Sequence, residues 1–342
     1  MQHEITQAIP LLDEQGELTQ PGWARRLLPV YDRSKVRGGP LRLKERDCYL
    51  VMNRQCALAL TISDNRYMGM DSISLIDLWE GWQVTRSPMR LMPLGGTGLP
   101  QSSLRGSCAR AGRGYGLLFQ HEGEGRTLHA HMDRFRDGQA LDAQILLTQE
   151  PEESIVMCTP FEKPGQFYFN QKINCMRAQG KVTLGDREYV FDPEDSFAVL
   201  DWGRGVWTCR GTWYWGSASG MVDGVPFGFN IGYGFGDTSA ATENALFYGG
   251  KLHKLSQVTF HIPRKNGQEH YLAPWTFDSD DRRFRMKFRP ILDRAACPSA
   301  GVVRSGQHQV FGSFTGTAVL DDGTAVRLKE LLGFAEKVDD RW

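Results

Sequence analysis

Short runs of alternating apolar and polar residues, separated by turn-forming residues, recur along almost all of the 342 residues. A period of two is typical of a β-strand with one buried face, and Gly, Asp and Asn between the runs favour tight turns. The clearest hairpin turns are 184–188 and 319–326, where Gly beside Asp tolerates a positive φ. Strands joined by tight turns pair antiparallel, because a parallel pair needs a long crossover. The pattern therefore predicts an all-β, mostly antiparallel protein, with strands at 48–53, 56–64, 73–81, 154–161, 167–173, 180–191, 206–218, 225–235, 252–262, 283–291, 307–324 and 326–338.

So many strands do not fit one flat sheet, because long antiparallel sheets curl or split. Two lipocalin-like barrel or sandwich domains fit the length. We expect an N-terminal domain with an N-terminal extension over 1–165 and a C-terminal domain over 166–342, divided at a polar, Pro-containing segment. Helices are few, and the best candidates for short ones are 237–247 and part of 20–33. The segment 93–116, rich in Gly, Ser and Arg, is either a mobile lid or a disordered connection, and we favour the connection.

The charge balance excludes one broad class of function. The chain has 40 basic and 40 acidic residues, whereas a dedicated nucleic-acid binder carries a basic surplus. The most basic stretch, 282–289, alternates basic with apolar residues, which indicates a strand with one solvent-facing side. We expect no nucleic-acid partner.

Cysteine and histidine usage gives no sign of a disulfide framework or a metal centre. The seven Cys are odd in number and form no CxxC pair, so reduced thiols in a cytoplasmic setting are expected. His121, His129 and His131 cluster in the sequence, and His129 and His131 are expected on one strand face, but no third ligand stands at a recognisable zinc spacing from this pair. No signal peptide and no apolar run of about 18 residues is found, so membrane insertion is not expected. We expect no metal and no cofactor, and the oligomeric state stays open.

Two aromatic segments concentrate polar groups. In 201–207 (DWGRGVW), Asp201 and Arg204 are expected to pair across a turn, either as a structural ion pair or as a carboxylate whose pKa Arg204 tunes. In 213–220 (WYWGSASG), strand alternation puts Trp213, Trp215 and Ser217 on one face and Tyr214 on the other. Two Trp on one face indicate either core or the wall of a ligand cavity.

The stretch 230–244 (NIGYGFGDTSAATEN) is the third such segment. Asn230 and the Gly residues after it share one face, while Tyr233 lies on the other. A row of Gly leaves room for a facing aromatic or for a ligand, and its spacing is not that of a dinucleotide-binding loop. Asp237 either caps a turn or belongs to a site, and Glu243 and Asn244 follow it. Our candidate catalytic residues are Asp201, Asp237, Glu243, His308 and Glu336, and our candidate ligand-binding residues are Arg204, Trp213, Tyr214, Trp215, Ser217, Asn230, Tyr233 and Asn244.

These segments, with 307–316 (QHQVFGSFTG) and 333–336 (GFAE), resemble the domain-of-unknown-function family numbered 2804. The starts 4–6, 11–18 and 22–26 resemble the usual beginning of that family, so the resemblance covers nearly the whole chain. It implies a β-rich architecture similar to the calycin-type two-barrel proteins, which include carotenoid hydratases, tocopherol cyclase and lipid-binding members. It implies no catalytic residue.

Three functions remain open from the sequence. The first is a cofactor-independent hydratase, cyclase or isomerase that binds a small apolar or amphipathic molecule in an aromatic-lined barrel cavity and uses a buried carboxylate as proton donor. The alternative is a carrier of a lipid-like ligand, which needs the same cavity without a perturbed acid. A weaker alternative is a carbohydrate-active hydrolase, because paired carboxylates and Trp platforms also suit sugars.

Overall fold

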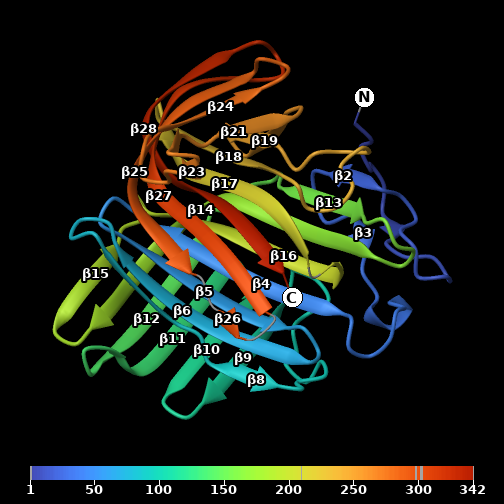
Figure 1. The fold of residues 1–342 in the computed structure, drawn as a ribbon, viewed down its shortest axis with the longest axis horizontal. Helices are drawn as coiled ribbons and strands as arrows, with labels where there is room; N and C mark the ends of the chain where they lie inside the picture. Colours follow the sequence, from blue (N-terminus) through green and yellow to red (C-terminus); the bar gives the residue numbers. More distant parts are fainter. Residues whose placement is uncertain (1, 209, 297–298, 301–302, 342) are drawn as a thin grey trace.

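The computed structural model describes residues 2–208, 210–296, 299–300 and 303–341, and its secondary structure is almost entirely antiparallel β-sheet (Figure 1). This confirms the predicted fold class. Two large sheets carry most of the described residues, one of fourteen strands and one of ten. Two further strand pairs are small: the parallel pair β1 (Ile9–Pro10) and β3 (Pro29–Val30), and the hairpin β22 (Arg264–Lys265) and β23 (Gln268–Glu269).

The first sheet contains most strands of the N-terminal part of the chain. Its path runs through β7 (Trp82–Arg86), β6 (Met68–Asp77), β5 (Cys56–Asp64), β4 (Lys44–Met52), β16 (Phe197–Val206), β14 (Phe167–Leu184), β12 (Gln139–Thr148), β11 (Gly125–Arg136), β10 (Tyr115–Gly123) and β9 (Gly106–Gly112). Four shorter strands pair beside this path: β2 (Gly22–Ala24), β8 (Met89–Leu91), β13 (Ile155–Pro160) and β15 (Arg187–Phe191).

The second sheet is a curled half-barrel built from the C-terminal part of the chain. Its path runs through β20 (Lys251–Lys254), β19 (Ala245–Tyr248), β18 (Val225–Tyr233), β17 (Arg210–Val222), β28 (Ala325–Arg341), β27 (Val303–Val319), β25 (Phe284–Ala296), β24 (Trp275–Ser279) and β21 (Val258–His261), and β26 (Ser299–Ala300) pairs with β27. The chain passes from one sheet to the other between β16 and β17. The predicted division into 1–165 and 166–342 concerns domains rather than sheets, and it stays a prediction.

The buried apolar residues form four clusters, and three of them show how the two sheets pack. On β16, Leu200 and Trp202 belong to the large core of the first sheet, whereas Val199 belongs to a smaller cluster shared with the second sheet. That shared cluster also contains Leu50 of β4 and Phe334 of β28. The second sheet has its own aromatic-rich core on its other face. The two sheets therefore pack against each other through one face of each.

Direct hydrogen bonds join the two sheets at the same interface. The Asn174 side chain on β14 donates to Ser217 Oγ at 2.8 Å and to the Phe229 carbonyl at 3.1 Å. The backbone N–H of Cys175 donates to Ser219 Oγ at 3.0 Å. These bonds satisfy polar groups that the packing of the sheets removes from water.

Two of the predicted local structures are wrong. The segments 237–247 and 20–33 contain no α-helix, and the one described helical turn is the 3-10 turn η1 (Arg33–Lys35), which follows β2 and β3. At 237–247 the loop continues directly into β19. The Asp237 cap closes a short turn instead, because Asp237 Oδ1 accepts from the Ser239 N–H at 2.9 Å.

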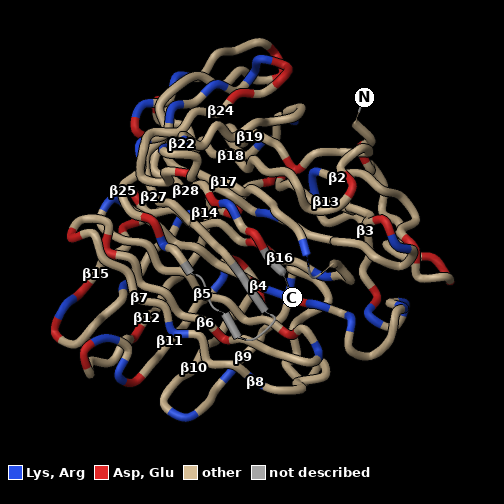
Figure 2. The backbone as a smooth tube through the Cα atoms, in the orientation of Figure 1, with Lys and Arg blue, Asp and Glu red and all other residues tan. Residues whose placement is uncertain are grey.

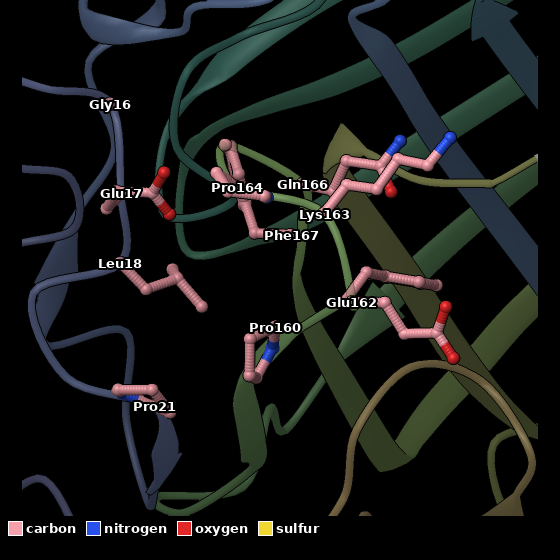
Figure 3. Close-up of a pocket in the computed structure, with 12 residues that line it drawn as sticks. Gly16, Glu17, Leu18, Pro21, Pro160, Glu162, Lys163, Pro164, Gln166 and Phe167 are labelled. Carbon is pink, nitrogen blue, oxygen red and sulfur yellow. The ribbon is translucent and has the colours of Figure 1, made fainter.

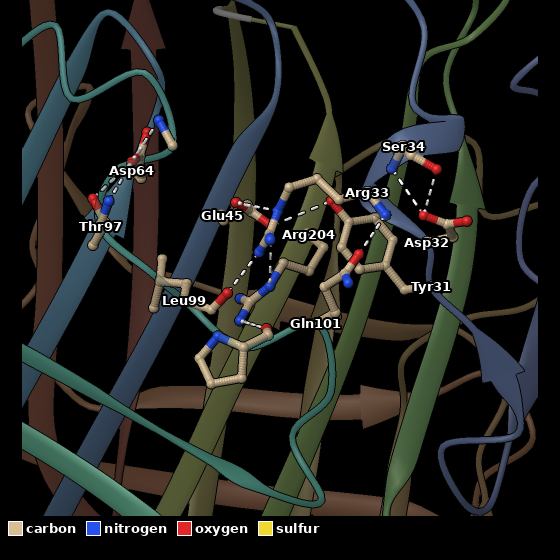
Figure 4. A network of polar contacts seen from close by, with 12 residues as sticks. Tyr31, Asp32, Arg33, Ser34, Glu45, Asp64, Thr97, Leu99, Gln101 and Arg204 are labelled. Atoms are coloured by element: carbon tan, nitrogen blue, oxygen red, sulfur yellow. Dashed lines mark hydrogen bonds and ion pairs between the residues drawn. The ribbon is translucent and has the colours of Figure 1, made fainter.

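The segment 93–105 is an ordered loop rather than a disordered connection. Asp64 Oδ2 accepts from the Gly95 N–H at 3.0 Å and from Thr97 Oγ1 at 2.6 Å. Arg33 donates to the Leu99 carbonyl, and Leu99 is buried in the core of the first sheet (Figure 4). Residues 106–112 then form β9. The loop therefore covers one end of the first core.

Charged residues of both signs are interspersed over both sheets (Figure 2). On β25, Phe284, Met286 and Phe288 are buried and the basic residues between them are exposed, as the alternation at 282–289 predicts. No helix among the described residues is long and apolar enough to cross a membrane. Within the described ranges, no group of three or more His, Cys, Asp or Glu is placed to hold a metal. The described cysteines are free thiols, and Cys209 and Cys297 lie outside the described residues.

Candidate functional site

Three polar side chains of the first sheet form a row that faces the second sheet. Cys48 on β4, Asp201 on β16 and Lys172 on β14 are direct register partners, so their side chains lie on the same face. Lys172 Nζ lies 3.0 Å from Asp201 Oδ1, and Arg46 forms an ion pair with Asp201 Oδ2. The Tyr168 hydroxyl lies 3.4 Å from Asp201 Oδ1. Asp201 is therefore the centre of a buried ionic network.

The cations around Asp201 decide its charge state. Only 1% of its side chain is exposed, and burial by itself raises the pKa of a carboxyl. Lys172 and Arg46 outweigh this effect and hold the pKa of Asp201 below its usual value. Burial likewise lowers the pKa of Lys172, but the charges of Asp201 and Glu243 outweigh it and the net shift is upward. Both groups are therefore charged at neutral pH.

The predicted pair of Asp201 with Arg204 is wrong. Residues 197–206 form one continuous strand rather than a turn, so positions three apart lie on opposite faces. Arg204 lies on the core side of the first sheet, where its guanidinium donates to Asp47 Oδ1 at 2.8 Å and to the Pro100 carbonyl at 2.7 Å. Glu45 lies 3.6 Å from Arg204 Nε. Arg204 therefore anchors the loop that covers the first core.

The second sheet presents a matching polar row to the interface. Arg294 on β25, Gln309 on β27, Glu336 on β28 and Trp215 on β17 are successive register partners. Glu336 is buried and its Oε2 accepts from Gln309 at 3.0 Å. A second donor, the Gln307 side chain, lies at 3.2 Å from the same oxygen. Glu336 is thus held by neutral amides rather than by an ion pair.

Burial raises the pKa of Glu336. The hydrogen bond from Gln307 and the charges of Arg46, Arg294 and Lys172 act in the opposite direction but do not cancel it. The interface therefore contains two carboxyls whose pKa values are shifted in opposite directions. The pKa of Asp201 is lowered by its cations, and the pKa of Glu336 is raised by burial.

A chain of contacts links the two polar rows. Trp215 Nε1 donates to Asn230 Oδ1 at 2.7 Å, and Asn230 Nδ2 donates to Glu243 Oε2 at 3.0 Å. The same Glu243 oxygen lies 3.8 Å from Lys172 Nζ. Lys172 also lies 4.2 Å from the centre of the Trp215 ring, which is a cation–π contact. The structure thus brings together the predicted Asp201, Trp215, Asn230, Glu243 and Glu336.

The glycine row of 230–244 has a specific use within this network. A Cβ at position 232 would lie 2.6 Å from Glu243 Oε1, so Gly232 makes room for the Glu243 carboxylate. At position 228, the same space is taken by Cys175 Sγ of the first sheet. A Cβ at position 234 would meet the Thr212 carbonyl, and one at position 236 would meet Thr159 and the ring of Phe161. The space beside the glycines is therefore filled by the protein itself, including a facing aromatic at Gly236, and no ligand is needed to explain it.

Aromatic rings border the ionic network near one end of the sheets. Phe235 lies at their centre, with its ring 5.2 Å from Trp213, 4.9 Å from Tyr168 and 5.3 Å from Phe161. Trp207 lies 5.1 Å from Tyr168. This aromatic group places the predicted Trp213 beside the site rather than inside the network.

A surface hollow of about 300 Å³ (Figure 3) adjoins this aromatic group. Leu18, Pro21, Pro160 and Phe167 contribute to its walls, and Phe161 belongs both to the hollow and to the aromatic group. None of the charged residues of the network lines it. The hollow is therefore a neighbour of the site and not its reaction centre.

Several predicted residues lie away from the network. Tyr214 and Tyr233 stack on each other at 4.5 Å on the opposite face of the second sheet. His308 is also on that face, bonded to Asp293 at 2.7 Å. Their catalytic and binding roles stay predictions that this placement does not support. Three others have local structural partners: Asp237 with Ser239, Ser217 with Asn174, and Asn244 with Gly232 N–H and the Ser256 carbonyl.

The site also contains four residues that were not predicted from the sequence: Arg46, Lys172, Tyr168 and Arg294. Lys172 follows two other polar residues, Asn170 and Gln171, in the predicted strand 167–173 (FYFNQKI), so its neighbours in sequence do not mark it as buried. A lysine buried in a sheet needs an anion as partner. Which carboxylate it meets depends on the pairing of β14 with β16, and this pairing is not local in sequence.

The fold and site define an all-β protein of two packed antiparallel sheets with an ionic network between them. The chain belongs to the family described as "Domain of unknown function (DUF2804)", whose model matches residues 2–342, which confirms the resemblance found in the sequence. A search of curated proteins finds no significant match.

Solved structures with a similar backbone come from other kinds of protein. A putative AttH from Nitrosomonas europaea has a TM-score of 0.50 at 12% identity, over 90% of this chain and 95% of that chain. Kievitone hydratase from Nectria haematococca has a TM-score of 0.49 at 10% identity, over 97% and 98% of the two chains. CghA with Sch210972 has a TM-score of 0.48 at 12% identity, over 96% and 97%. At these identities, the first likeness concerns the fold alone, and the other two are weaker and carry no activity from one protein to the other.

Proposed function

We propose that this protein is a cofactor-independent lyase or isomerase that transfers a proton to a small apolar or amphipathic substrate between its two sheets. The observation that carries the proposal is Glu336, a buried carboxyl whose pKa burial raises, within electrostatic reach of the Asp201 network. Proton-transfer enzymes commonly separate the pKa values of two carboxyls so that one stays protonated and the other ionised.

The two carboxyls support different roles. Glu336, kept protonated, is the proton donor to an alkene, enol or carbonyl group of the substrate. Asp201 stays ionised, and its negative charge stabilises the positive charge that develops on the substrate after protonation. Glu243 is more accessible, with 18% of its side chain exposed, and is placed to accept a proton in the return step of an isomerisation.

Fewer of the aromatic side chains are free to contact a substrate than the sequence suggests. Lys172 lies over the ring of Trp215, and the ring of Phe334 meets Trp215 edge-on at 4.7 Å. Trp215 therefore positions Lys172 and is not a free wall for a substrate cation. Trp207, Trp213 and Phe235 remain partly exposed beside the network and are better placed to contact an apolar substrate.

The alternatives have less support. A passive carrier of a lipid-like molecule needs an apolar cavity, whereas the region between the sheets holds several charged side chains and the faces away from it carry packed apolar cores. A carbohydrate-active hydrolase needs two carboxyls on either side of a sugar, and Asp201 is already bonded to two cations. Proton transfer is instead supported by the opposite pKa shifts of Asp201 and Glu336.

The test is conversion of metabolites by the full-length protein. Purified protein is incubated with a small-molecule extract of the source cells, and mass spectrometry follows compounds that disappear as an isomer or a product differing by one water appears. Glu336→Gln keeps the shape but removes the proton, and we expect it to lower the rate by about 100-fold or more. The matched control is Glu330→Gln, which changes an exposed carboxylate on the same strand and keeps the wild-type rate.

The pH dependence has a defined sign. Since the protonated form of Glu336 is the active one, the rate falls as pH rises through the raised pKa of this carboxyl. Glu336→Gln removes that limb of the profile from any remaining activity. Equal rates for wild type and Glu336→Gln, or a ligand recovered unchanged from both, contradict the proposed function.

A further inference from the structure

Among the described residues, Arg294 is a cation of the site that has no carboxylate partner. It lies on β25 in the same cross-strand row as Gln309 and Glu336, and its Nη1 donates to the neutral Gln309 Oε1 at 3.0 Å. No Asp or Glu oxygen of the described residues lies within 4.0 Å of its guanidinium. The adjacent Asp293 points to the opposite face and bonds to His308. Arg294 therefore has hydrogen-bond donors to spare.

Arg46 has a spare donor on the first sheet. One of its terminal nitrogens pairs with Asp201, but its Nε is buried and, among the described residues, has no hydrogen-bond partner. About two-fifths of the side chain is still open to solvent, at 41% exposed, so the group is reachable from outside. The charges of Arg46 and Arg294 both influence the pKa values of Cys48 and Glu336, so the two arginines lie in the same region between the sheets.

Two of the three cations of this region contact carboxylates directly, and Arg294 contacts none among the described residues. Arg46, Lys172 and Arg294 are cationic, and Lys172 and Arg46 share Asp201. Glu243 is the other carboxylate near Lys172, and burial disfavours the ionised form of Glu336. A partly buried cation without a counter-charge is costly, and an anion from outside offsets that cost.

We propose that the substrate carries an anionic group, a carboxylate or an acidic enol, which binds to the guanidinium of Arg294 with Arg46 beside it. This inference rests on the proposed function, because it names the substrate class of the same site. A guanidinium presents planar paired N–H donors that match a carboxylate, and such charge-assisted bonds are stronger than neutral ones. The anionic end then lies next to Glu336, which places the adjoining carbons of the substrate at the proton donor.

The test compares two probes that differ in charge and hardly in shape. Isothermal titration calorimetry measures binding of 2-naphthoate and of its neutral amide, 2-naphthamide, to the full-length protein. We expect wild type to bind the carboxylate about tenfold more tightly, because a charge-assisted pair is stronger than a neutral hydrogen bond. Arg294→Gln brings the two affinities together, whereas Arg289→Gln, an exposed arginine on the same strand paired with Glu330, keeps the preference.

Added salt provides a measurement that needs no variant. Raising the ionic strength weakens binding of 2-naphthoate to wild type and leaves 2-naphthamide unchanged. The inference is overturned if wild type binds the two probes equally or binds neither at millimolar concentration. It is also overturned if Arg294→Gln still prefers the carboxylate.

The conversion assay separates this inference from the proposed function. If Glu336→Gln abolishes conversion while Arg294→Gln keeps the carboxylate preference, the proposed function stands and the anion site is refuted. If Arg294→Gln removes the preference while Glu336→Gln converts metabolites normally, the anion site stands and the proton donor is refuted.

Discussion

At the scale of single residues, Asp201 and Glu336 show how position decides the charge of chemically similar groups. Both are buried and both lie within reach of Arg46. Asp201 has two cations in direct contact, and Glu336 has two amides. The difference in pKa follows from these contacts, because a carboxylate bonded to cations keeps its charge and one held by neutral donors in a buried place favours its proton.

Substitution of Lys172 tests how much its ion pair with Asp201 contributes to stability. Lys172→Met keeps the length of the side chain but leaves Asp201 with a reduced counter-charge in a buried place. We expect a loss of about 3–5 kcal/mol in the free energy of unfolding, measured by urea titration. Lys181→Met changes an exposed lysine on the same strand, paired with Glu188, and should change stability by less than about 0.5 kcal/mol. Similar losses for both variants would mean that the buried pair contributes no more than a surface pair.

At the scale of elements, β18 and the loop after it act together. Gly232 on β18 gives space to the Glu243 carboxylate, and Asn230 on the same strand binds that carboxylate. Asn244 then accepts from the Gly232 N–H at 2.7 Å, which fixes the loop against the end of the strand. A loop held at both its backbone and its side chains keeps Glu243 beside Lys172.

Gly232→Ala tests this arrangement. The added methyl group would meet Glu243 Oε1 at 2.6 Å and the Tyr214 carbonyl at 2.7 Å, so the loop must move. We expect a loss of about 1–3 kcal/mol in stability, as in other overpacked sites, together with slower substrate conversion. Gly211→Ala on β17 is the control, because nothing lies within 4 Å of a Cβ there. A Gly232→Ala variant as stable and active as Gly211→Ala would show that Glu243 needs no such space.

The strands themselves were predictable, because period-two alternation and Gly–Asp turns are local signals. The side chains that meet across neighbouring strands could not be predicted from the sequence. Asp201 and Arg204 are three residues apart, and their expected pairing assumed a tight bend at Gly203 and Gly205. Pairing with β4 and β14 instead keeps the segment extended. Arg46 and Lys172 meet Asp201 through register between strands distant in sequence. The candidate carboxylates could therefore be selected from the sequence, but their cations could not.

At the scale of the whole molecule, one interface holds both the site and the packing of the sheets. The resemblance to two-barrel proteins correctly implied two β-rich parts. It did not show that the key polar groups lie between these parts, on the faces turned away from the two large cores. A location inside the cytoplasm stays a prediction from cysteine usage.

Because the sheets share this interface, we expect them to unfold together. Phe334 on β28 is 1% exposed and packs in the shared cluster with Val199 and Leu50 of the first sheet. Phe334→Ala should cost about 3–5 kcal/mol, because it removes a large side chain from a packed interface. Leu146→Ala, at a 40% exposed position on β12, serves as the control and should cost less than about 1 kcal/mol.

Hydrogen exchange in urea, measured on separate peptides, follows each sheet. Peptides from β5 and from the first half of β25 report on the first and second sheets respectively. If the interface couples the sheets, both peptides lose protection at the same urea concentration in wild type, and Phe334→Ala shifts both midpoints by the same amount. Two separate midpoints in wild type, or a shift confined to the second sheet, would instead show that each sheet is stable alone and that the ionic network forms only after the sheets dock.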